Sequence, residues 1–511
     1  MTHSPAKIAL GWCFESIRIT DKIVALSEWL RSYHYEPVWI TLSNVTRYAL
    51  ALEGLTAHSI NEFIPHESYL VVAENTPDRE LQSDFRNDRI SKRRLLNFPV
   101  AGDEEYIEAC GYFLRRFWTS MMAAYCPDLV VNLNGQNGVS ATLGRIAAKH
   151  DIPTVFFENG LLPDTLVLDP VGVNYLSHVG GSGWQSAVAP SPTAAEKQLL
   201  QDRIESITKG GLTMMPHGTQ VGNRRLRQDL NISSESHIVL VPLQVDLDTN
   251  ILFHSPVVST MREFVTQVVA GLHQDGPDDC VLIIKEHPKR APAGDPEIRH
   301  CCSERVKYVH DIDVTSLLEI ADQVVCINTT VGLEAAIRGI PVVCLGRSAY
   351  SEKGFTTDAY LTKNPFVTVS QALATNRTGP DSDAVERFLC YILRNSLLPT
   401  GPTDPFAARA VLADRLLSGL KSGSVQTPDV SAELQKLLQD SIADNQQFCD
   451  KVKGNRNLSI EQRSENAPGS FLKARIEAGY MTPGRQVRLT DGSLRSRVAN
   501  LFRIRTDRIR V

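Results

Sequence analysis

The chain has 511 residues, of which 42% are hydrophobic and 22% charged, and its formal charge is −5. This composition is typical of a globular protein long enough to bury two hydrophobic cores, and the negative charge excludes a globally basic nucleic-acid-binding protein. The ten cysteines include no CxxC pair, so the sequence predicts neither a zinc site nor a disulfide framework, and a reducing cytoplasm fits best. No segment approaches the ~20 apolar residues of a membrane-spanning helix, so any membrane attachment is expected to be peripheral.

Strand and helix patterns alternate through the first third of the chain. Apolar runs at residues 37–42, 128–133 and 153–157 are typical of buried strands, and helical spacing marks residues 23–30 and 139–149. Alternation of strands with helices indicates a parallel sheet. The first part of the chain is therefore predicted to be a Rossmann-like domain.

The alternation resumes after a polar stretch at residues 209–231, which lacks sustained periodicity and is predicted to join two domains. Beyond it the sequence predicts four buried strands and two helices between them. The strands are expected at residues 237–241, 280–284, 323–327 and 341–345, and the helices at 261–272 and 330–338. This pattern predicts a second doubly wound domain.

The predicted organisation has three segments, at residues 1–210, 232–395 and 396–511. The third is an extension in which the strand and helix alternation weakens. Its expected parts are helices at 407–420 and 432–448, a polar linker at 454–470 and a basic tail at 471–511.

The tail contains ten Lys or Arg against three acidic residues, and its spacing fits a helix in one part and a strand in another. Clustered arginines with interspersed Leu, Ile and Phe suit an anionic lipid surface, where each cation contributes about 1 kcal/mol. The same composition equally fits a solvated extension without a partner.

Polar residues that follow the predicted strands are the first candidates for a site, because ligands of open parallel sheets bind outside the carboxyl ends of the strands. Three strand ends carry such residues. They are Glu158 and Asn159 after 153–157, Gln244, Asp246 and Asp248 after 237–241, and Lys285, Glu286 and His287 after 280–284.

A fourth strand end begins the sequence NTTVGLEAAIRG. Asn328, Thr329 and Thr330 are good N-caps for the following helix, and Gly339 suits its C-cap. The N–H groups and dipole of such a helix start bind anions, and threonine hydroxyls add donors, so a nucleotide phosphate fits here. Taken alone, the pattern fits a capped helix without a ligand better.

Two carboxylates and a histidine suggest chemistry. Glu158 and Asp248 belong to different halves of the chain and are expected to face an interdomain cleft, where such a pair suits glycosyl transfer. His287 could donate to a phosphate and stabilise a departing nucleotide. The alternatives are that the carboxylates cap helices or form salt bridges, and that the histidine is a surface or core residue.

Four sequence motifs in this order resemble those of bacterial capsular-polysaccharide synthesis proteins, a family that includes the retaining β-Kdo transferases. They are Phe156–Asn174, Leu243–Asp248, Lys285–Pro288 and Asn328–Tyr350. The resemblance covers roughly residues 104–355. At the helix start the family more often has serine followed by threonine, whereas this chain has Thr329–Thr330, which keeps both hydroxyls.

The resemblance implies a GT-B-like α/β fold with two Rossmann-type domains facing a cleft, an N-terminal acceptor domain and a C-terminal donor domain. It implies transfer of Kdo from CMP-Kdo, without a metal or other cofactor, to a lipid or saccharide acceptor with retention. Asp248 would be the nucleophile or base, with Asp246 as the alternative, and Glu158 its partner in proton transfer. The implied donor-binding residues are Gln244, Lys285, His287, Asn328, Thr329, Thr330, Gly332 and Glu334.

The sequence patterns that suggest an acceptor site are less specific than those that suggest a donor site. Asn134 and Gln136 lie in a glycine- and amide-rich loop that opens a helix, and with Asn159 they are candidates to bind an acceptor, although an ordinary capped helix start explains the loop. The leading hypothesis is a cytoplasmic capsule glycosyltransferase, peripheral on the inner membrane. The alternatives are a GT-B transferase with a different nucleotide-sugar donor and a non-catalytic capsule assembly or export factor.

Overall fold

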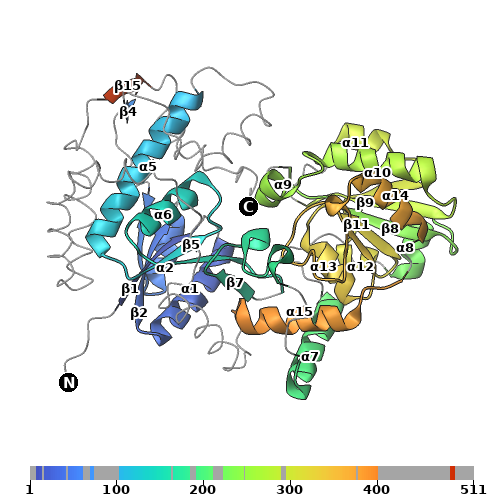
Figure 1. Ribbon diagram of the computed structural model, residues 1–511, viewed down its shortest axis with the longest axis horizontal. Coiled ribbons are helices and arrows are strands. Elements are labelled where there is room, and N and C mark those ends of the chain that lie inside the picture. The colour runs from blue at the N-terminus through green and yellow to red at the C-terminus, as the bar shows by residue number, and fades with distance from the viewer. Residues whose placement is uncertain are drawn as a thin grey trace. The chain divides into compact units, whose positions relative to one another are not determined.

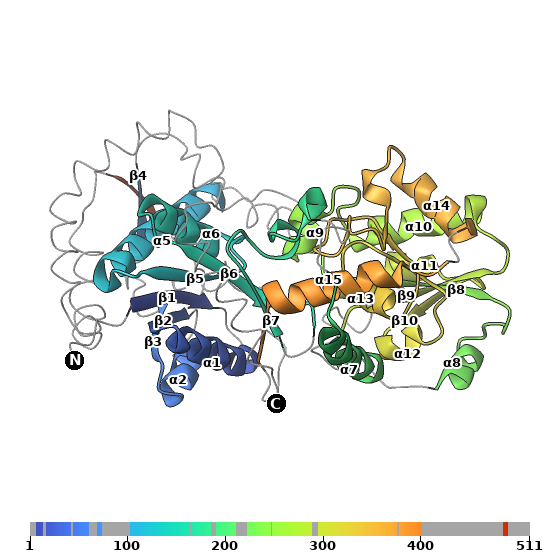
Figure 2. The ribbon, with the colours of Figure 1, turned by 60° about the horizontal axis from the view of Figure 1, so that its bottom comes forward.

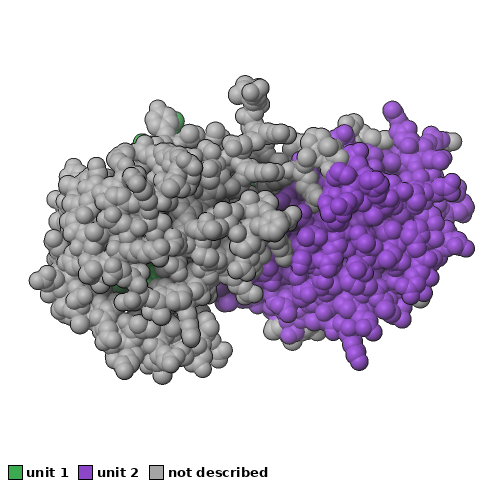
Figure 3. Space-filling view, turned by 90° about the horizontal axis from the view of Figure 1, so that it is seen from above, with its two compact units in different colours: residues 1–158, 416–511 green, residues 159–415 purple. Residues whose placement is uncertain are grey.

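The computed structural model describes the following residues of the chain: 7–13, 17–41, 44–60, 69–73, 103–162, 165–184, 191–210, 222–246, 248–288, 295–375, 378–400 and 484–488. The chain divides into two compact units (Figure 3). Unit 1 comprises residues 1–158 and 416–511, and unit 2 comprises residues 159–415.

Unit 1 is built on parallel strands in the order β3-β2-β1-β5-β6, which matches the first five strands of the Rossmann order. Helices α1 and α2 cover one face, and α5 and α6 cover the other (Figures 1 and 2). The strands are β1 (Lys7–Cys13), β2 (Tyr35–Thr41), β3 (Thr56–Ser59), β5 (Leu129–Leu133) and β6 (Thr154–Asn159). The helices are α1 (Ile17–Ser32), α2 (Asn44–Leu52), α5 (Asp103–Tyr125) and α6 (Gly138–Lys149).

Four further short strands form two antiparallel pairs. β4 (Tyr69–Ala73) pairs with β15 (Gly484–Arg488), which belongs to the predicted basic tail. β7 (Thr165–Asp169) pairs with β14 (Leu397–Pro399), and the complete order of that sheet is β14-β7-β6-β5-β1-β2-β3. Three 3-10 turns lie at Asn174–Leu176, Gly181–Gly183 and Ala359–Leu361.

Unit 2 contains a parallel sheet in the order β10-β9-β8-β11-β12-β13, with α10 and α14 on one face and α12 and α13 on the other (Figures 1 and 2). This is the full Rossmann order, with its switch point between β8 and β11. The strands are β8 (His237–Pro242), β9 (Cys280–Lys285), β10 (Val306–Val309), β11 (Gln323–Cys326), β12 (Val342–Cys344) and β13 (Thr357–Asp358). The helices are α7 (Ala194–Gly210), α8 (Asn223–Asp229), α9 (Thr249–His254), α10 (Met261–Asp275), α11 (Pro296–His300), α12 (Val314–Leu318), α13 (Thr330–Ile337), α14 (Pro365–Thr375) and α15 (Ser382–Asn395).

The central strands of unit 2 form because their residues are apolar on both faces. Every residue of β8, β9 and β11 is buried, as expected for parallel strands covered by helices on both sides. On the α10 face, Val239 and Leu282 pack in one cluster with Phe264 and Val268 of α10 and Leu373 of α14. This core holds the strand ends in fixed register, which positions the polar residues that follow them.

The sequence predicted this α/β class correctly, and the expected strands of both halves are present. Two differences are informative. The polar stretch at 209–231 contains α8 at its end, and the short strands β7 and β14 lack any alternating pattern that could have predicted them. The helices expected at 407–420 and 432–448 lie outside the described residues.

Residues 159–210 fall in the same compact unit as the second sheet, whereas the sequence assigned them to the N-terminal domain. The reason is local packing: α7 contacts α12 and α15, and Arg394 of α15 forms an ion pair with Glu196 of α7. Among the described residues no helix is both long and apolar enough to cross a membrane.

Candidate functional site

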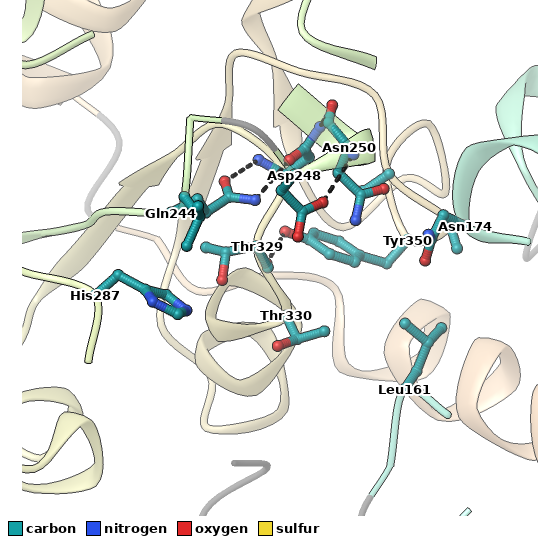
Figure 4. A pocket seen from close by; sticks show the side chains of 13 residues that line it. Leu161, Asn174, Gln244, Asp248, Asn250, His287, Thr329, Thr330 and Tyr350 are labelled. Carbon is teal, nitrogen blue, oxygen red and sulfur yellow. Dashed lines mark hydrogen bonds between the residues drawn. The ribbon is translucent and has the colours of Figure 1, made fainter. Parts of the chain in front are cut away.

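A pocket of about 220 Å³ lies in unit 2, where β8, β9, β11 and β12 end (Figure 4). This is the edge of a parallel sheet at which ligands bind. The pocket is lined by Leu161, Asn174, Gln244, Val245, Asp248, Asn250, His287, Asn328, Thr329, Thr330, Ser348, Ala349 and Tyr350. Six of the residues predicted to form the site are therefore brought together.

The floor of the pocket is a pair of buried amides at the switch point. Gln244 after β8 donates through Nε2 to Oδ1 of Asn328 after β11, at 2.9 Å, and the main-chain N–H of Asn328 donates back to Gln244 Oε1 at 3.3 Å. Asn328 Nδ2 also donates to the carbonyls of Asn250 at 2.9 Å and Arg347 at 3.2 Å. The two amides thus join strand ends, α9 and the loop after β12 into a rigid base.

The N-terminus of α13 forms one wall. Thr329 is its N-cap and accepts from Val331 N at 3.4 Å, while Thr330 is exposed in the pocket. Tyr350 donates to the Thr329 carbonyl at 2.5 Å and so holds the cap in place. A helix start with two hydroxyls beside a cavity is suited to an anion, because its dipole and first-turn N–H groups favour negative charge.

Gly332 lies in the first turn of α13, and its lack of a side chain leaves space for neighbouring residues. A Cβ at this position would lie 2.4 Å from Tyr350 Oη and 3.0 Å from Cys326 Sγ. The glycine therefore allows Tyr350 to approach the helix start closely. Gly332 was predicted to bind the donor, and the structure gives it this packing role.

The two candidate aspartates differ in place. Asp248 is exposed, lines the pocket and is the N-cap of α9, where its Oδ1 accepts from Asn250 N at 2.8 Å. Asp246 Oδ1 accepts from the first N–H of α10, Met261 N, at 2.6 Å, and Asp246 is not part of the pocket lining. Both aspartates therefore accept from the first turn of a helix, but only Asp248 also lines the cavity.

His287 lies at the opposite end of the pocket from Leu161 and Asn174, with Thr329 and Thr330 between them (Figure 4). Its position is fixed by Glu286, which is fully buried and accepts from His287 N at 2.8 Å and from Tyr308 Oη at 2.8 Å. The imidazole can therefore approach a ligand at the start of α13 from one side.

Two charged residues predicted to bind the donor lie outside the pocket lining. Lys285 is buried, and its Nζ donates to the carbonyls of Glu286 at 2.9 Å and His310 at 2.7 Å, while burial lowers the pKa of its ammonium. Glu334 is fully buried and accepts from Arg338 at 3.1 Å, and Arg338 also donates to the Thr208 carbonyl at 3.0 Å. Both side chains hold elements together, Lys285 at the end of β9 and Glu334 between α13 and α7.

The remaining predicted residues follow β5 and β6. Glu158 Oε2 accepts from Asn134 Nδ2 at 3.0 Å, and Asn134 Oδ1 accepts from Gln136 N at 3.2 Å. Asn159 is exposed and lines a second, narrower pocket of unit 2 with Leu161 and other residues. An acceptor-binding role for Asn134, Gln136 and Asn159 stays a prediction.

Sequence reasoning missed several pocket residues, among them Asn174, Asn250 and Tyr350. Asn174 belongs to a 3-10 turn and has a positive φ of 55°, and Tyr350 lies in a loop. Neither position carries a pattern that marks a site. Within the described part of the chain no three His, Cys, Asp or Glu side chains gather as a metal site would require, and the expectation of metal-free activity stays a prediction.

Two Rossmann-ordered sheets, one with an anion-suited helix start at its switch point, define an α/β protein with a GT-B-like architecture. Residues 206–376 match the family described as "Capsule polysaccharide biosynthesis protein". That segment includes all the pocket residues except Leu161 and Asn174. The predicted resemblance to capsular-polysaccharide synthesis proteins is therefore confirmed.

Two curated proteins and one solved structure are among those similar to this chain. Protein FixF of Sinorhizobium fredii is 29% identical over 338 residues, which cover 64% of this chain and 75% of the relative. The capsule polysaccharide export protein KpsS of Escherichia coli is 30% identical over 149 residues, or 28% of this chain and 38% of the relative. Among solved structures, the Thermosulfurimonas dismutans KpsC β-Kdo 2,7 transferase is similar with a TM-score of 0.38 at 18% identity, covering 61% of this chain and 95% of that one.

Proposed function

We propose that the protein is a retaining glycosyltransferase of capsule polysaccharide biosynthesis that transfers Kdo from CMP-Kdo to a lipid or saccharide acceptor. The observation that supports this most directly is the pocket itself. It combines an anion-suited helix start, an imidazole and a carboxylate at one sheet edge. These are the groups needed to bind a nucleotide phosphate and to act on the sugar attached to it.

The donor phosphate would lie at the start of α13. There it would receive hydrogen bonds from the hydroxyls of Thr329 and Thr330 and from first-turn N–H groups. His287 would donate from the side and stabilise the charge that develops on the departing CMP. The amide floor of Gln244 and Asn328 would keep this arrangement rigid, so little reorganisation would be needed during the reaction.

The carboxylate of Asp248 would act at the anomeric carbon. Its attack forms a bond to that carbon while the bond from the carbon to the phosphate oxygen breaks, and CMP leaves with the electron pair. An acceptor hydroxyl then displaces Asp248 and gives its proton to a base, a role that the family resemblance implies for Glu158. Two successive inversions give net retention.

The test of this function is release of CMP from CMP-Kdo in the presence of a Kdo-terminated or lipid acceptor. We expect Asp248→Asn to lower kcat by about a thousandfold or more, because the variant lacks the nucleophilic charge. Asparagine is as good an N-cap as aspartate, so the thermal midpoint should not change. Asp246→Asn is the matched control and should keep most of the activity, since its amide oxygen can still accept from Met261 N.

Loss of activity in Asp246→Asn but not in Asp248→Asn would overturn the assignment of the nucleophile. Wild-type protein that binds CMP but never releases it from CMP-Kdo would instead favour a non-catalytic capsule factor. Thermal-shift titrations with CMP, UDP and GDP distinguish the donor, because the proposal requires the largest stabilisation from CMP.

Peripheral attachment to the inner membrane is part of the proposal, and it assigns membrane binding to the basic tail. Because β15 at Gly484–Arg488 pairs with β4, the truncation should begin after it and remove residues 489–511. Six arginines are lost with that segment. We expect weaker sedimentation with anionic liposomes and unchanged CMP binding, and equal sedimentation would contradict the membrane role.

A further inference from the structure

We propose that the pocket of unit 2 contains a subsite for an acidic sugar, in which Arg347 binds the sugar carboxylate and the side-chain amides of Asn174 and Asn250 bind its hydroxyls. This inference rests on the proposed function and deepens it, because it names the class of sugar that the pocket selects and the residues that select it. All three residues belong to unit 2.

The main chain of Arg347 is part of the framework around the pocket. Its N–H donates to the His254 carbonyl at 2.7 Å, and its carbonyl accepts from Nδ2 of the floor amide Asn328 at 3.2 Å. Ser348, the next residue, lines the pocket. The Arg347 side chain therefore starts from a fixed point at the edge of the pocket.

The guanidinium of Arg347 lies over the ring of Tyr175, 5.4 Å from its centroid, and Tyr175 directly follows the pocket residue Asn174. Arg347 is exposed, and among the described residues its guanidinium forms no ion pair or hydrogen bond. Glu352, the acid next to Tyr175, instead accepts from the hydroxyls of Tyr360 at 2.7 Å and Tyr175 at 3.4 Å. The cation is thus held near the Asn174 end of the pocket by an aromatic face, with its donors available to a ligand.

Two amides of the pocket are available in the same way. Asn174 and Asn250 line the pocket, and within the described part of the chain neither side-chain amide has a hydrogen-bond partner. Both lie on the side of the pocket away from His287 (Figure 4). The main-chain N–H of Asn250 donates to Asp248 Oδ1 at 2.8 Å, which places Asn250 next to the proposed nucleophile. An amide offers both donors and acceptors, which suits the hydroxyls of a sugar.

The proposed reaction determines which end of the pocket receives the sugar. His287 would lie beside the departing nucleotide and Asp248 at the anomeric carbon, so the sugar would extend away from His287, toward the two amides. An acidic sugar would bring its carboxylate near that of Asp248, and the two like charges repel each other. No described residue that lines the pocket is Lys or Arg. Arg347 at the edge offsets this repulsion, and its forked donors match a carboxylate.

The experiment compares ligands that differ only in the charge of the sugar, by isothermal titration without an acceptor. The probes are CMP-Kdo, its methyl ester at the sugar carboxylate, and free CMP. We expect the wild type to bind CMP-Kdo about tenfold more tightly than the ester, because the ester lacks the charged partner of Arg347. Arg347→Gln should lose this difference and bind free CMP as the wild type does.

The matched control is Arg225→Gln, an equal change of charge on α8, where the Arg225 side chain is 80% exposed. It should keep the tenfold difference. Equal binding of CMP-Kdo and its ester by the wild type would overturn the inference. So would a loss of affinity in Arg347→Gln that is the same for all three probes, because a general electrostatic or structural effect would explain it.

Substitution of the amides tests the other half of the subsite. Asn174→Asp tolerates the positive φ of 55° and places a carboxylate beside the guanidinium. We expect it to weaken CMP-Kdo binding about tenfold and to leave free CMP unaffected. Asn250→Ala should weaken CMP-Kdo and its ester by the same factor of about three, because this amide binds hydroxyls. Wild-type affinity for CMP-Kdo in both variants would remove the amides from the subsite.

A second pair of probes separates the inference from the proposed function. UDP-glucuronate and UDP-glucose also differ by one sugar carboxylate. A preference for UDP-glucuronate that Arg347→Gln abolishes supports the acidic subsite even if no CMP is released from CMP-Kdo, in which case only the proposed function fails. CMP release from CMP-Kdo at the wild-type rate and KM in Arg347→Gln would instead keep the function and overturn the inference.

Discussion

An asparagine follows β5 in one Rossmann-ordered sheet and β11 at the equivalent point of the other. The two amides differ in their hydrogen-bond partners. Asn328, after β11, bonds to Gln244 and to main-chain carbonyls of two other segments, α9 and the loop after β12. Asn134, after β5, bonds to a main-chain N–H and to the carboxylate of Glu158. One amide builds a floor under a pocket, and the other contacts a group that can gain or lose a proton.

The difference follows from the neighbours that each sheet supplies. In unit 2 the strand end of β8 carries another amide, Gln244, with which Asn328 forms two hydrogen bonds. In unit 1 the neighbouring strand ends in an acid. The same residue type at the same kind of strand end therefore bonds to amides and carbonyls in one sheet and to a carboxylate in the other, depending on the adjacent strand.

The largest effect on stability is expected from removing the floor amide. Asn328→Ala leaves Gln244 Nε2 without its acceptor and the carbonyls of Asn250 and Arg347 without their donor, which should lower the free energy of unfolding by about 3 kcal/mol. Asn250→Ala is the matched control, because only the main-chain carbonyl of Asn250 serves Asn328. Urea unfolding measures both. Equal stability losses in the two variants would contradict the framework role of the Asn328 amide.

Each unit contains a buried histidine that should make its stability depend on pH. Burial, with a smaller contribution from a nearby arginine, lowers the pKa of His58 in unit 1 and of His254 in unit 2 to about 4, from an ordinary 6.5. Above pH 6.5 both histidines are neutral in the folded and in the unfolded chain, so their contribution to the free energy of unfolding is fully present. As the pH falls from 6.5 to 4, only the unfolded chain takes up the proton, so this contribution is lost.

Each histidine should account for about 3 kcal/mol of that loss, since one pKa unit corresponds to 1.36 kcal/mol. His254→Phe should therefore flatten the dependence of unfolding free energy on pH between 6.5 and 4. His273→Gln, an exposed change on α10, should leave the curve unchanged in shape. Parallel curves for wild type and His254→Phe would show that His254 takes up its proton in the folded state as readily as in the unfolded chain.

Much of the fold could be predicted from the sequence because the relevant signals are local. Runs such as HIVLVP and CVLIIK are buried on both faces, and only parallel strands covered by helices use such runs at this length. The start of α13 was predicted at the observed residue because Thr329 can satisfy a first-turn N–H and marks the helix boundary.

The direction of individual side chains could not be predicted, since it depends on contacts remote in sequence. Lys285 and Glu334 are charged residues near strand and helix ends, as site residues often are. Lys285, however, donates a hydrogen bond to the His310 carbonyl, and Glu334 forms an ion pair with Arg338. Conversely, Asn174 reaches the pocket from a turn more than 60 residues before β8. Only the assembled fold determines which polar residues become internal braces and which remain available to a ligand.

The smallest expected effect concerns the two threonines at the start of α13. One caps the helix, and the other lines the pocket. Thr329 caps the helix, so Thr329→Ala should lower the free energy of unfolding by about 1 kcal/mol and also weaken CMP binding. Thr330 is exposed and lines the pocket, so Thr330→Ala should weaken CMP binding about tenfold, the loss of one charge-assisted hydrogen bond, with stability unchanged. Thr330→Ser keeps the hydroxyl and should bind as the wild type does. Isothermal titration with CMP distinguishes these outcomes, and wild-type affinity in Thr330→Ala would move the phosphate away from this end of the helix.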